Sequence, residues 1–361
     1  MLFVIDYIIL LFPMFFHSNK LFIYMDACTG PLTLNMVCAT ITSYHFTGSR
    51  MITHTLLSTA VPHKDTFITI GVFDGVHRGH RHVMDTLNNL SDANNCLATC
   101  VTFRNHPATL LRQGASVDLI TSLFQRKALL KDAGLDLIVD VEFTMEISLL
   151  SPRQFLDVLR TELRMKGLVV GPDFAMGHNR EGTVDVLRKL AVEMKFELIV
   201  IDPLVFLGKP IKSHFIRENL RDGKVKAASD MLGRNFSMVC PVTHGDGLGK
   251  KLGFPTANLD VQKNQLIPKN GIYATWTKVD GQFYKSATSI GVRPTFGAGQ
   301  LQVETFLLDF EGDLYGKTLM LEFQSCVREE IAFPSQSSLV CQMNKDVDRV
   351  RVLLSDDGRG K

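Results

Sequence analysis

A regular alternation of short apolar runs with longer amphipathic segments between residues 66 and 202 most constrains the fold. Such alternation predicts parallel strands joined by helices that cover both faces of one sheet. We expect strands over residues 66–73, 96–103, 135–141, 167–170 and 197–201. Helices are expected over residues 80–90, 123–133, 152–163 and 184–194. Ser151 and Pro152 supply an N-cap and a first-turn proline to the third helix. The sequence therefore predicts a doubly wound α/β domain.

After residue 233 the pattern changes to closely spaced strands separated by Gly, Asp and Asn turns. We expect these strands over residues 237–243, 271–279, 282–290, 302–308 and 318–323. The dipeptide Asp280-Gly281 is a strong signal for a hairpin turn between two of them. A small β-barrel is the expected closure, because it removes exposed strand edges. Residues 335–354 are expected to form a helix that covers it.

The first fifty residues differ in composition from the rest of the chain. They contain only four charged side chains, Asp6, Lys20, Asp26 and Arg50. The apolar stretch 2–16 is shorter than the roughly 20 residues that span a bilayer, and it lacks the basic flank of a secretory signal. We therefore expect an extension outside the fold, with a membrane anchor as the alternative. The predicted organisation is an extension over 1–50, the α/β domain over 51–232 and the barrel domain over 233–355.

Charge and cysteine usage narrow the classes of partner. Lys and Arg number 39 against 37 Asp and Glu, and no basic run is present, so nucleic acid is not an expected partner. The seven cysteines form no CxxC pair and no metal-ligand spacing, which disfavours a disulfide framework or a zinc site. Scattered thiols are mostly small buried residues in a reducing compartment, which predicts a cytoplasmic protein.

The densest motif runs from Gly71 to His80, where the first strand is expected to end and a helix to begin. Ligands of open α/β sheets bind at this carboxyl edge. Gly71 and Gly79 allow close backbone approach, and the imidazoles of His77 and His80 can donate to phosphate oxygens at a helix N-terminus. Such a site can stabilise charge on an α-phosphate while pyrophosphate is displaced, without a protein nucleophile.

This HxGH element in a GxFDGxHxGH frame resembles the nucleotidylyltransferase superfamily. The version in this chain resembles the bacterial bifunctional riboflavin kinase/FAD synthetase family, and the resemblance extends over nearly all of residues 66–350. It implies catalytic roles for His77 and His80, and ATP contacts at Gly71, Phe73 and Gly79.

Two further segments resemble the flavin-adenylylating half of that family. Thr102-Phe103 with His106-Pro107 is similar to its TFxxHP loop, which implies flavin contacts at Phe103, His106 and Pro107. Residues 171–182 are similar to its GxDFxFGxxRxG segment, which implies that Asp173 helps to bind nucleotide or flavin.

The chain departs from the family at the SSTxIR motif, where it reads Lys-Ser-His-Phe-Ile-Arg over residues 212–217. Ser213 and Arg217 lie four residues apart on one helix face and can reach phosphate oxygens. Lys212 and His214 replace a serine and a threonine, and both are competent phosphate partners. We expect FAD synthesis to persist and to depend on pH through the His214 imidazole.

A glycine-rich loop followed by two polar residues marks the start of the second domain. Backbone amides of such a loop can cradle a polyphosphate, and the oxygens of Thr256 and Asn258 suit magnesium. The GxPTAN string resembles the riboflavin kinase module, in which it carries ATP and metal. The expected phosphate contacts are Gly245, Gly247, Gly249, Lys250 and Gly253.

Further along, Val303-Glu304 opens a segment similar to the VExxLLDF motif of the same module. This implies that Glu304 is the kinase general base, since a carboxylate near a sugar hydroxyl can accept its proton during phosphoryl transfer. Arg293 is the expected flavin contact in the segment 291–296. Residues 328–333 resemble the RxExKF tail, which implies a flap on the flavin side.

The sequence thus predicts an enzyme that phosphorylates riboflavin to FMN in the barrel and adenylylates FMN to FAD in the α/β domain. ATP and Mg²⁺ are the implied cosubstrate and metal, and the only expected partners are small molecules. Two alternatives stay open: a riboflavin kinase with an inactive adenylyltransferase domain, and a non-enzymatic flavin-binding regulator. The oligomeric state is not predicted.

Overall fold

The computed structural model describes residues 62–112, 116–245, 247–292 and 301–355. The predicted extension over 1–50, the proposed start of the folded part at Met51 and the flavin contact at Arg293 lie outside these residues.

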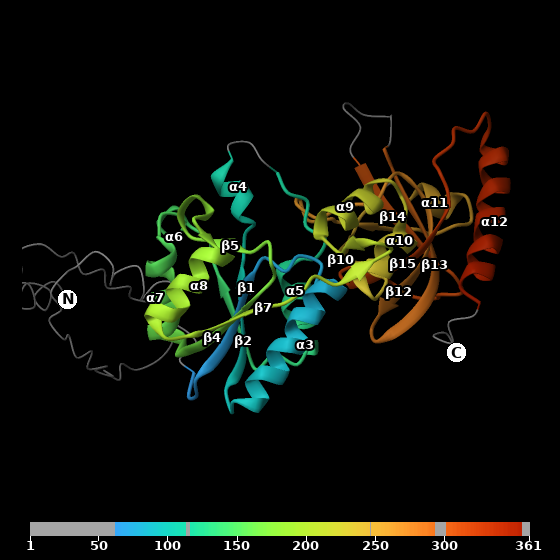
Figure 1. Cartoon of the computed structure of the whole chain (residues 1–361). Helices are drawn as coiled ribbons and strands as arrows, with labels where there is room; N and C mark the ends of the chain where they lie inside the picture. The colour runs from blue at the N-terminus through green and yellow to red at the C-terminus, as the bar shows by residue number, and fades with distance from the viewer. Residues whose placement is uncertain (1–61, 113–115, 246, 293–300, 356–361) are drawn as a thin grey trace, which may run out of the picture. The chain divides into compact units, whose positions relative to one another are not determined.

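The α/β domain is built on a five-stranded parallel sheet with strand order β3-β2-β1-β4-β7. Figure 1 labels its strands β1, β2, β4 and β7. The strands are β1 (Thr66–Gly71), β2 (Leu97–Phe103), β3 (Leu137–Val141), β4 (Met165–Val170) and β7 (Glu197–Val200). Each predicted strand is present, with its ends shifted by at most two residues. The central strand β1 pairs in register with β2, so that Gly71 lies opposite Thr102 at the carboxyl edge.

Helices cover both faces of this sheet, as expected for a doubly wound fold. Ile68 and Ile70 of β1 face one core, and Phe67, which precedes Ile68, faces the other, because side chains alternate along a strand. The helices α7 (Pro152–Leu163) and α8 (Val184–Met194) pack on the first face. The helices α3 (Arg78–Ala93) and α5 (Leu123–Asp132) pack on the second face. Ser151 caps α7 and Pro152 occupies its first turn, as predicted.

Short elements that the sequence pattern did not reveal surround the carboxyl edge. They are α4 (Pro107–Leu111), α6 (Met145–Ser148), the 3-10 turn η1 (His178–Arg180), and two hairpins, β5 (Ala175–Met176) with β6 (Gly182–Thr183) and β8 (Val205–Phe206) with β9 (Lys209–Pro210). The helices α9 (Ser213–Arg221) and α10 (Val225–Leu232) then lead to the second domain.

The second domain is a closed barrel with strand order β10-β11-β14-β13-β12-β15. Its strands are β10 (Phe236–Thr243), β11 (Ala257–Leu259), β12 (Gly271–Val279), β13 (Gln282–Val292), β14 (Leu301–Leu307) and β15 (Thr318–Arg328). Asp280 and Gly281 both have positive φ and join β12 to β13 with Val279 opposite Gln282, which confirms the predicted hairpin. The three-residue strand β11 was not predicted, since it is too short to show a period.

Helix α12 (Gln336–Leu353) covers the barrel as predicted, and Ser335 caps its N-terminus. Val350 and Leu354 pack against Ala274 and Trp276 of β12. The short helix α11 (Leu248–Lys251) lies within the glycine-rich segment.

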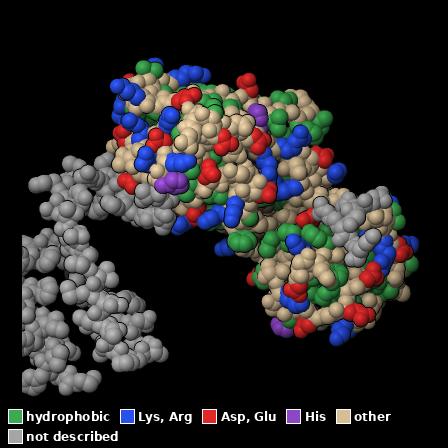
Figure 2. All heavy atoms as spheres, turned by 90° about the horizontal axis from the view of Figure 1, so that it is seen from below, with side chains coloured by type: hydrophobic (Ala, Val, Ile, Leu, Met, Phe, Trp, Pro, Cys, Tyr) green, Lys and Arg blue, Asp and Glu red, His purple; other side chains and the backbone are tan. Residues whose placement is uncertain are grey.

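The exposure of the cysteines, the distribution of surface charge and the hydrophobicity of the helices bear on the sequence predictions. Cys96, Cys100 and Cys240 are buried, whereas Cys326 and Cys341 are exposed, so the expectation that the cysteines are buried is wrong for the last two. Figure 2 shows one face of the molecule, on which Lys and Arg side chains are interspersed with Asp and Glu. None of the described helices is long and apolar enough to cross a membrane.

Candidate active sites

A pocket of about 330 Å³ opens at the carboxyl edge of the parallel sheet. It lies beside the ends of β1, β4 and β7, where the strand order of the sheet places the topological switch. The predicted site residues that line it are Gly71, Phe73, His77, Gly79, His80, Asp173 and Ser213. Residues far apart in the sequence are thus brought to one pocket.

Two stacked imidazoles form the floor of this pocket at the start of α3. His77 is the N-cap, and its Nδ1 accepts a hydrogen bond from the His80 backbone N at 3.2 Å. Its proton therefore resides on Nε2, which can donate to a ligand. The rings of His77 and His80 lie 3.6 Å apart between centroids and nearly parallel, and Phe73 packs edge-on against His80.

Burial keeps both imidazoles neutral. It lowers the pKa of His77 to about 3, with a further contribution from the nearby Arg234 guanidinium. Burial also lowers the pKa of His80 well below its ordinary value, and the interactions with His77 and with the Arg126 guanidinium act in the same direction. Neutral imidazole carries one N–H donor, so the pair can hydrogen-bond phosphate oxygens at physiological pH without bearing charge.

The lowered pKa of His77 makes stability depend on pH. In the unfolded chain this imidazole takes up a proton as the pH falls below about 6.5, whereas in the folded chain it stays neutral down to about 3. Protonation of His77 therefore favours the unfolded chain. The unfolding free energy is unaffected above about pH 6.5 and decreases as the pH falls from there toward 3. We expect His77 to lower the unfolding free energy by about 2 kcal/mol when the pH is changed from 7 to 5. Urea titrations of wild type and His77→Asn at both pH values test this. Equal pH dependence in the two proteins would contradict it.

The loop between β1 and α3 has an unusual backbone. Phe73 and Val76 adopt positive φ values of 49° and 37°, which non-glycine residues rarely do. Arg234 holds the loop from below by donating to the carbonyl oxygens of Gly75 at 2.6 Å and Val76 at 3.1 Å. Sequence reasoning missed Arg234, because nothing near it in the sequence connects it to this loop.

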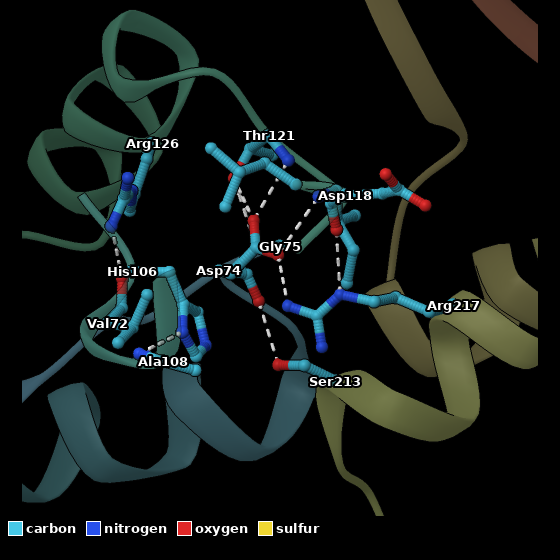
Figure 3. A network of polar contacts seen from close by, with 12 residues as sticks. Val72, Asp74, Gly75, His106, Ala108, Asp118, Thr121, Arg126, Ser213 and Arg217 are labelled. Atoms are coloured by element: carbon cyan, nitrogen blue, oxygen red, sulfur yellow. Dashed lines mark hydrogen bonds and ion pairs between the residues drawn. The ribbon is translucent and has the colours of Figure 1, made fainter. Parts of the chain in front are cut away.

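A buried carboxylate, Asp74, organises the same loop (Figure 3). It accepts hydrogen bonds from the backbone N of Ile120 and from the backbone N and hydroxyl of Thr121, at 2.9–3.1 Å. Arg217 forms a 2.6 Å ion pair with it, and Ser213 donates its hydroxyl to the Asp74 carbonyl oxygen at 3.0 Å. Sequence reasoning missed Asp74 because its partners lie 46 to 143 positions away.

This network changes the interpretation of the predicted pair Ser213 and Arg217. Ser213 lines the pocket, but Arg217 does not; its Nε donates to the Asp118 carbonyl oxygen at 2.9 Å while Nη2 binds Asp74. The structure thus gives Arg217 a role in holding the loop that carries His77. Its predicted contact with phosphate stays a prediction.

The TFxxHP loop follows β2. His106 is the N-cap of α4, with its Nδ1 accepting from the Ala108 backbone N at 3.2 Å, and Pro107 occupies the first turn. Phe103 is 9% exposed and packs edge-on against Phe143 in the core. The packing favours a core role for Phe103 over the predicted flavin contact.

The two residues that depart from the family motif, Lys212 and His214, lie in different surroundings. Lys212 lines the pocket and forms a 2.7 Å ion pair with Asp173, which lowers the pKa of that carboxyl group. His214 is exposed, does not line the pocket, and packs its ring against Phe215. The placement favours Lys212 over His214 as a phosphate partner.

A second pocket, of about 290 Å³, lies between the barrel and α12. The predicted residues Gly249, Thr256 and Glu304 line it together. The Thr256 hydroxyl donates to Glu304 Oε2 at 3.1 Å. Asn258 on β11 lies directly opposite Glu304 on β14 in the antiparallel register. Hydroxyl, amide and carboxylate groups are thus gathered at one place.

The glycine-rich loop approaches these polar groups closely. A Cβ on Gly249 would lie 2.4 Å from the Phe254 carbonyl oxygen and 2.8 Å from the Thr256 hydroxyl, and a Cβ on Gly245 would lie 2.1 Å from the Asn258 amide nitrogen. At Gly249 a side chain would meet backbone, so only glycine fits there, whereas at Gly245 a side chain would displace the Asn258 amide. Gly245, Gly247, Lys250 and Gly253 are exposed and lie outside the residues that line the pocket. Their predicted phosphate contacts stay predictions.

One wall of the second pocket was not predicted. Leu339, Met343 and Val347 of α12 line it, and Asp346 fixes this helix to the end of β15. Its carboxylate accepts three hydrogen bonds of 2.8–3.0 Å from Arg328 and is nearly fully buried. The sequence predicted a helix that covers the barrel, but it did not indicate that Leu339, Met343 and Val347, four residues apart along the helix, line a pocket.

The oxygen groups of the second pocket fit a magnesium ion. Among the described residues, no three His, Cys, Asp or Glu side chains gather as metal ligands. Magnesium does not need such a cluster, because it takes one or two protein oxygens and completes its shell with waters and substrate phosphates. Thr256, Asn258 and Glu304 offer oxygens of this kind.

Comparisons with known proteins match the barrel domain and the α/β domain separately. A family model described as riboflavin kinase matches residues 232–354, and one described as FAD synthetase matches residues 60–215. A bifunctional riboflavin kinase/FMN adenylyltransferase from Listeria monocytogenes is 31% identical over 290 residues, which is 80% of this chain and 92% of that protein. The protein of the same description from Escherichia coli K12 is 33% identical over 287 residues, which is 79% of this chain and 91% of that protein.

A solved structure is similar across most of the chain. It is described as a macrolide-efflux protein from Streptococcus pneumoniae, with a TM-score of 0.76 and 26% identity over 82% of this chain and 97% of that chain.

Proposed function

Because this chain belongs to the family of bifunctional riboflavin kinase/FMN adenylyltransferases, we propose that each of its two pockets carries out one of the two activities. The barrel domain phosphorylates riboflavin to FMN, and the α/β domain adenylylates FMN to FAD, both with ATP. The observation that carries this assignment is that His77 and His80 line one pocket, whereas Thr256 and Glu304 line another.

In the kinase step Glu304 accepts the proton of the ribityl 5′-hydroxyl as that oxygen attacks the γ-phosphate of ATP. The bond from the γ-phosphorus to the bridging oxygen breaks, and ADP leaves. The Thr256 hydroxyl, 3.1 Å from Glu304 Oε2, orients the carboxylate. Mg²⁺, held by Thr256 and Asn258, would neutralise charge on the phosphates when bound. The glycines at 245 and 249 let the loop backbone lie close to these groups.

In the transferase step an FMN phosphate oxygen attacks the α-phosphate of ATP, the bond to the β-phosphate breaks, and pyrophosphate leaves. Neutral His77 and His80 donate hydrogen bonds to the phosphate oxygens on which charge develops. The N-terminus of α3 adds its backbone amides and its dipole. No covalent enzyme intermediate is needed.

Lys212 gives a test that concerns this chain specifically. Its ammonium group lies in the phosphate pocket, paired with an exposed Asp173 that it can leave for a triphosphate. We expect Lys212→Ser to raise the KM for ATP in FAD formation roughly threefold to tenfold, the scale of a partly exposed charged contact. The matched control is His214→Thr, which should leave that KM unchanged. An effect of His214→Thr larger than that of Lys212→Ser would reverse the assignment.

The same proposal places the chain in the cytoplasm, where ATP is supplied and thiols stay reduced. Purified full-length protein incubated with riboflavin, ATP and Mg²⁺, followed by separation of riboflavin, FMN and FAD, tests the function as a whole. Both FMN and FAD should form. FMN alone would mean that only the kinase domain is active, and neither product would contradict the proposal.

A further inference from the structure

A fully buried arginine lies beneath the carboxyl edge of the parallel sheet. Arg126 of α5 is 0% exposed and is one of the largest fully buried side chains of the described chain. Its Nη1 donates to the carbonyl oxygens of Val72 at 2.6 Å and Phe103 at 2.9 Å. The first of these bonds is drawn in Figure 3. Nothing in the assigned chemistry uses this residue.

The two carbonyl groups lie at the carboxyl ends of the neighbouring strands β1 and β2, and Val72 lines the pocket whereas Phe103 does not. Val72 follows β1 and begins the loop that carries His77 and His80, and Phe103 ends β2 before the His106 loop. The Thr102 hydroxyl, 3.4 Å from Arg126 Nη1, also donates to the Val72 carbonyl oxygen at 3.1 Å. A single guanidinium nitrogen thus ties the exits of neighbouring strands together.

Burying the Arg126 guanidinium costs free energy, which the link between two carbonyl groups does not by itself explain. Within the described part of the chain, Arg126 Nε and Nη2 have no hydrogen-bond partner, and no carboxylate forms an ion pair with the guanidinium. Burial lowers its pKa, and Asp74 and Asp140 act on it only as nearby charges. A buried charge without an ion-pair partner is unfavourable, so a fold that needed only packing here would favour an apolar residue.

We propose that Arg126 is a positioning residue for adenylyl transfer, which holds the histidine loop and the His106 loop at the separation that the reaction requires. The inference rests on the proposed function of this pocket. It places the effect of Arg126 on the rate of the chemical step rather than on substrate affinity, because the guanidinium acts through the two loop carbonyls. A misplacement of reacting groups by about 1 Å can cost roughly 10²-fold in rate.

The test compares two substitutions in the full-length protein, each assayed for both activities. Arg126→Met removes the donor and the charge, and should lower kcat for FAD formation from FMN about 10²-fold while the KM values for ATP and FMN change by less than about threefold. Arg126→Lys can still donate to both carbonyl oxygens, and should keep kcat within about tenfold of wild type. Riboflavin phosphorylation in the barrel serves as the internal control for folding and should be unchanged.

A third variant keeps the proposal testable if Arg126→Met does not fold. Thr102→Val removes the second link to Val72 without changing charge, and should lower kcat in the same direction by a smaller factor. The proposal would be overturned by a wild-type kcat in Arg126→Met, or by an equal loss of kcat in Arg126→Lys. It would also be overturned if Arg126→Met lost both activities while Thr102→Val kept the wild-type kcat. A wild-type protein that forms no FAD would instead contradict the proposed function.

Discussion

Replacing Glu304 by glutamine should abolish FMN formation from riboflavin and leave FAD formation from supplied FMN at the wild-type rate. The amide keeps the size of the side chain and can still contact Thr256, but it cannot accept the ribityl proton. Loss of a general base costs about 10²- to 10⁴-fold in rate. Initial rates of each half-reaction, measured by separating the three flavins, give both numbers from one preparation.

The matched control is Glu311→Gln, which changes an exposed glutamate of the same domain and should behave as wild type. Equal loss of both activities in Glu304→Gln would point to a shared site or to global unfolding. A kinase rate within threefold of wild type would mean that Glu304 is not the base.

The second large effect is expected in the other domain. His80→Ala removes a buried donor at the start of α3 and should lower FAD formation about 10²- to 10³-fold, the usual effect of losing one donor to a developing oxyanion. Riboflavin phosphorylation should not change. Rates of FAD formation from FMN and ATP, with kinase rates on the same samples, measure this.

His82→Ala is the control on the same helix, because His82 lies outside the residues that line the pocket. If His80→Ala and His82→Ala reduce FAD formation alike, the donor role of His80 is wrong.

The fold could be predicted because its signals are local. The five strands of the parallel sheet are nearly continuous apolar runs, and the hairpin at Asp280-Gly281 is specified by two residues with positive φ. The strand β11 was missed because three residues cannot show a period. The hairpins near the pocket were missed because two-residue strands are set by the loops that they join.

The sites were predicted where the chemistry and the sequence motif coincide. His77, His80, Thr256 and Glu304 belong to compact motifs, and the structure brings each of them into a pocket. Arg217 illustrates what such reasoning misses. Its helical spacing from Ser213 indicated a shared face, but only the tertiary structure reveals the buried Asp74 that pairs with it. Asp346 was missed for the same reason, since its partner Arg328 lies on a separate strand.

The most direct test of two independent sites is to mix Glu304→Gln with His80→Ala, each of which lacks one of the two activities. Glu304→Gln alone should make no FAD from riboflavin because it forms no FMN, and His80→Ala alone should accumulate FMN. When equal amounts of the two proteins are mixed and given riboflavin, ATP and Mg²⁺, FAD should form. The FMN released by His80→Ala is then adenylylated by Glu304→Gln. No FAD from the mixture, with each half-reaction present on its own, would contradict separate sites linked by free FMN.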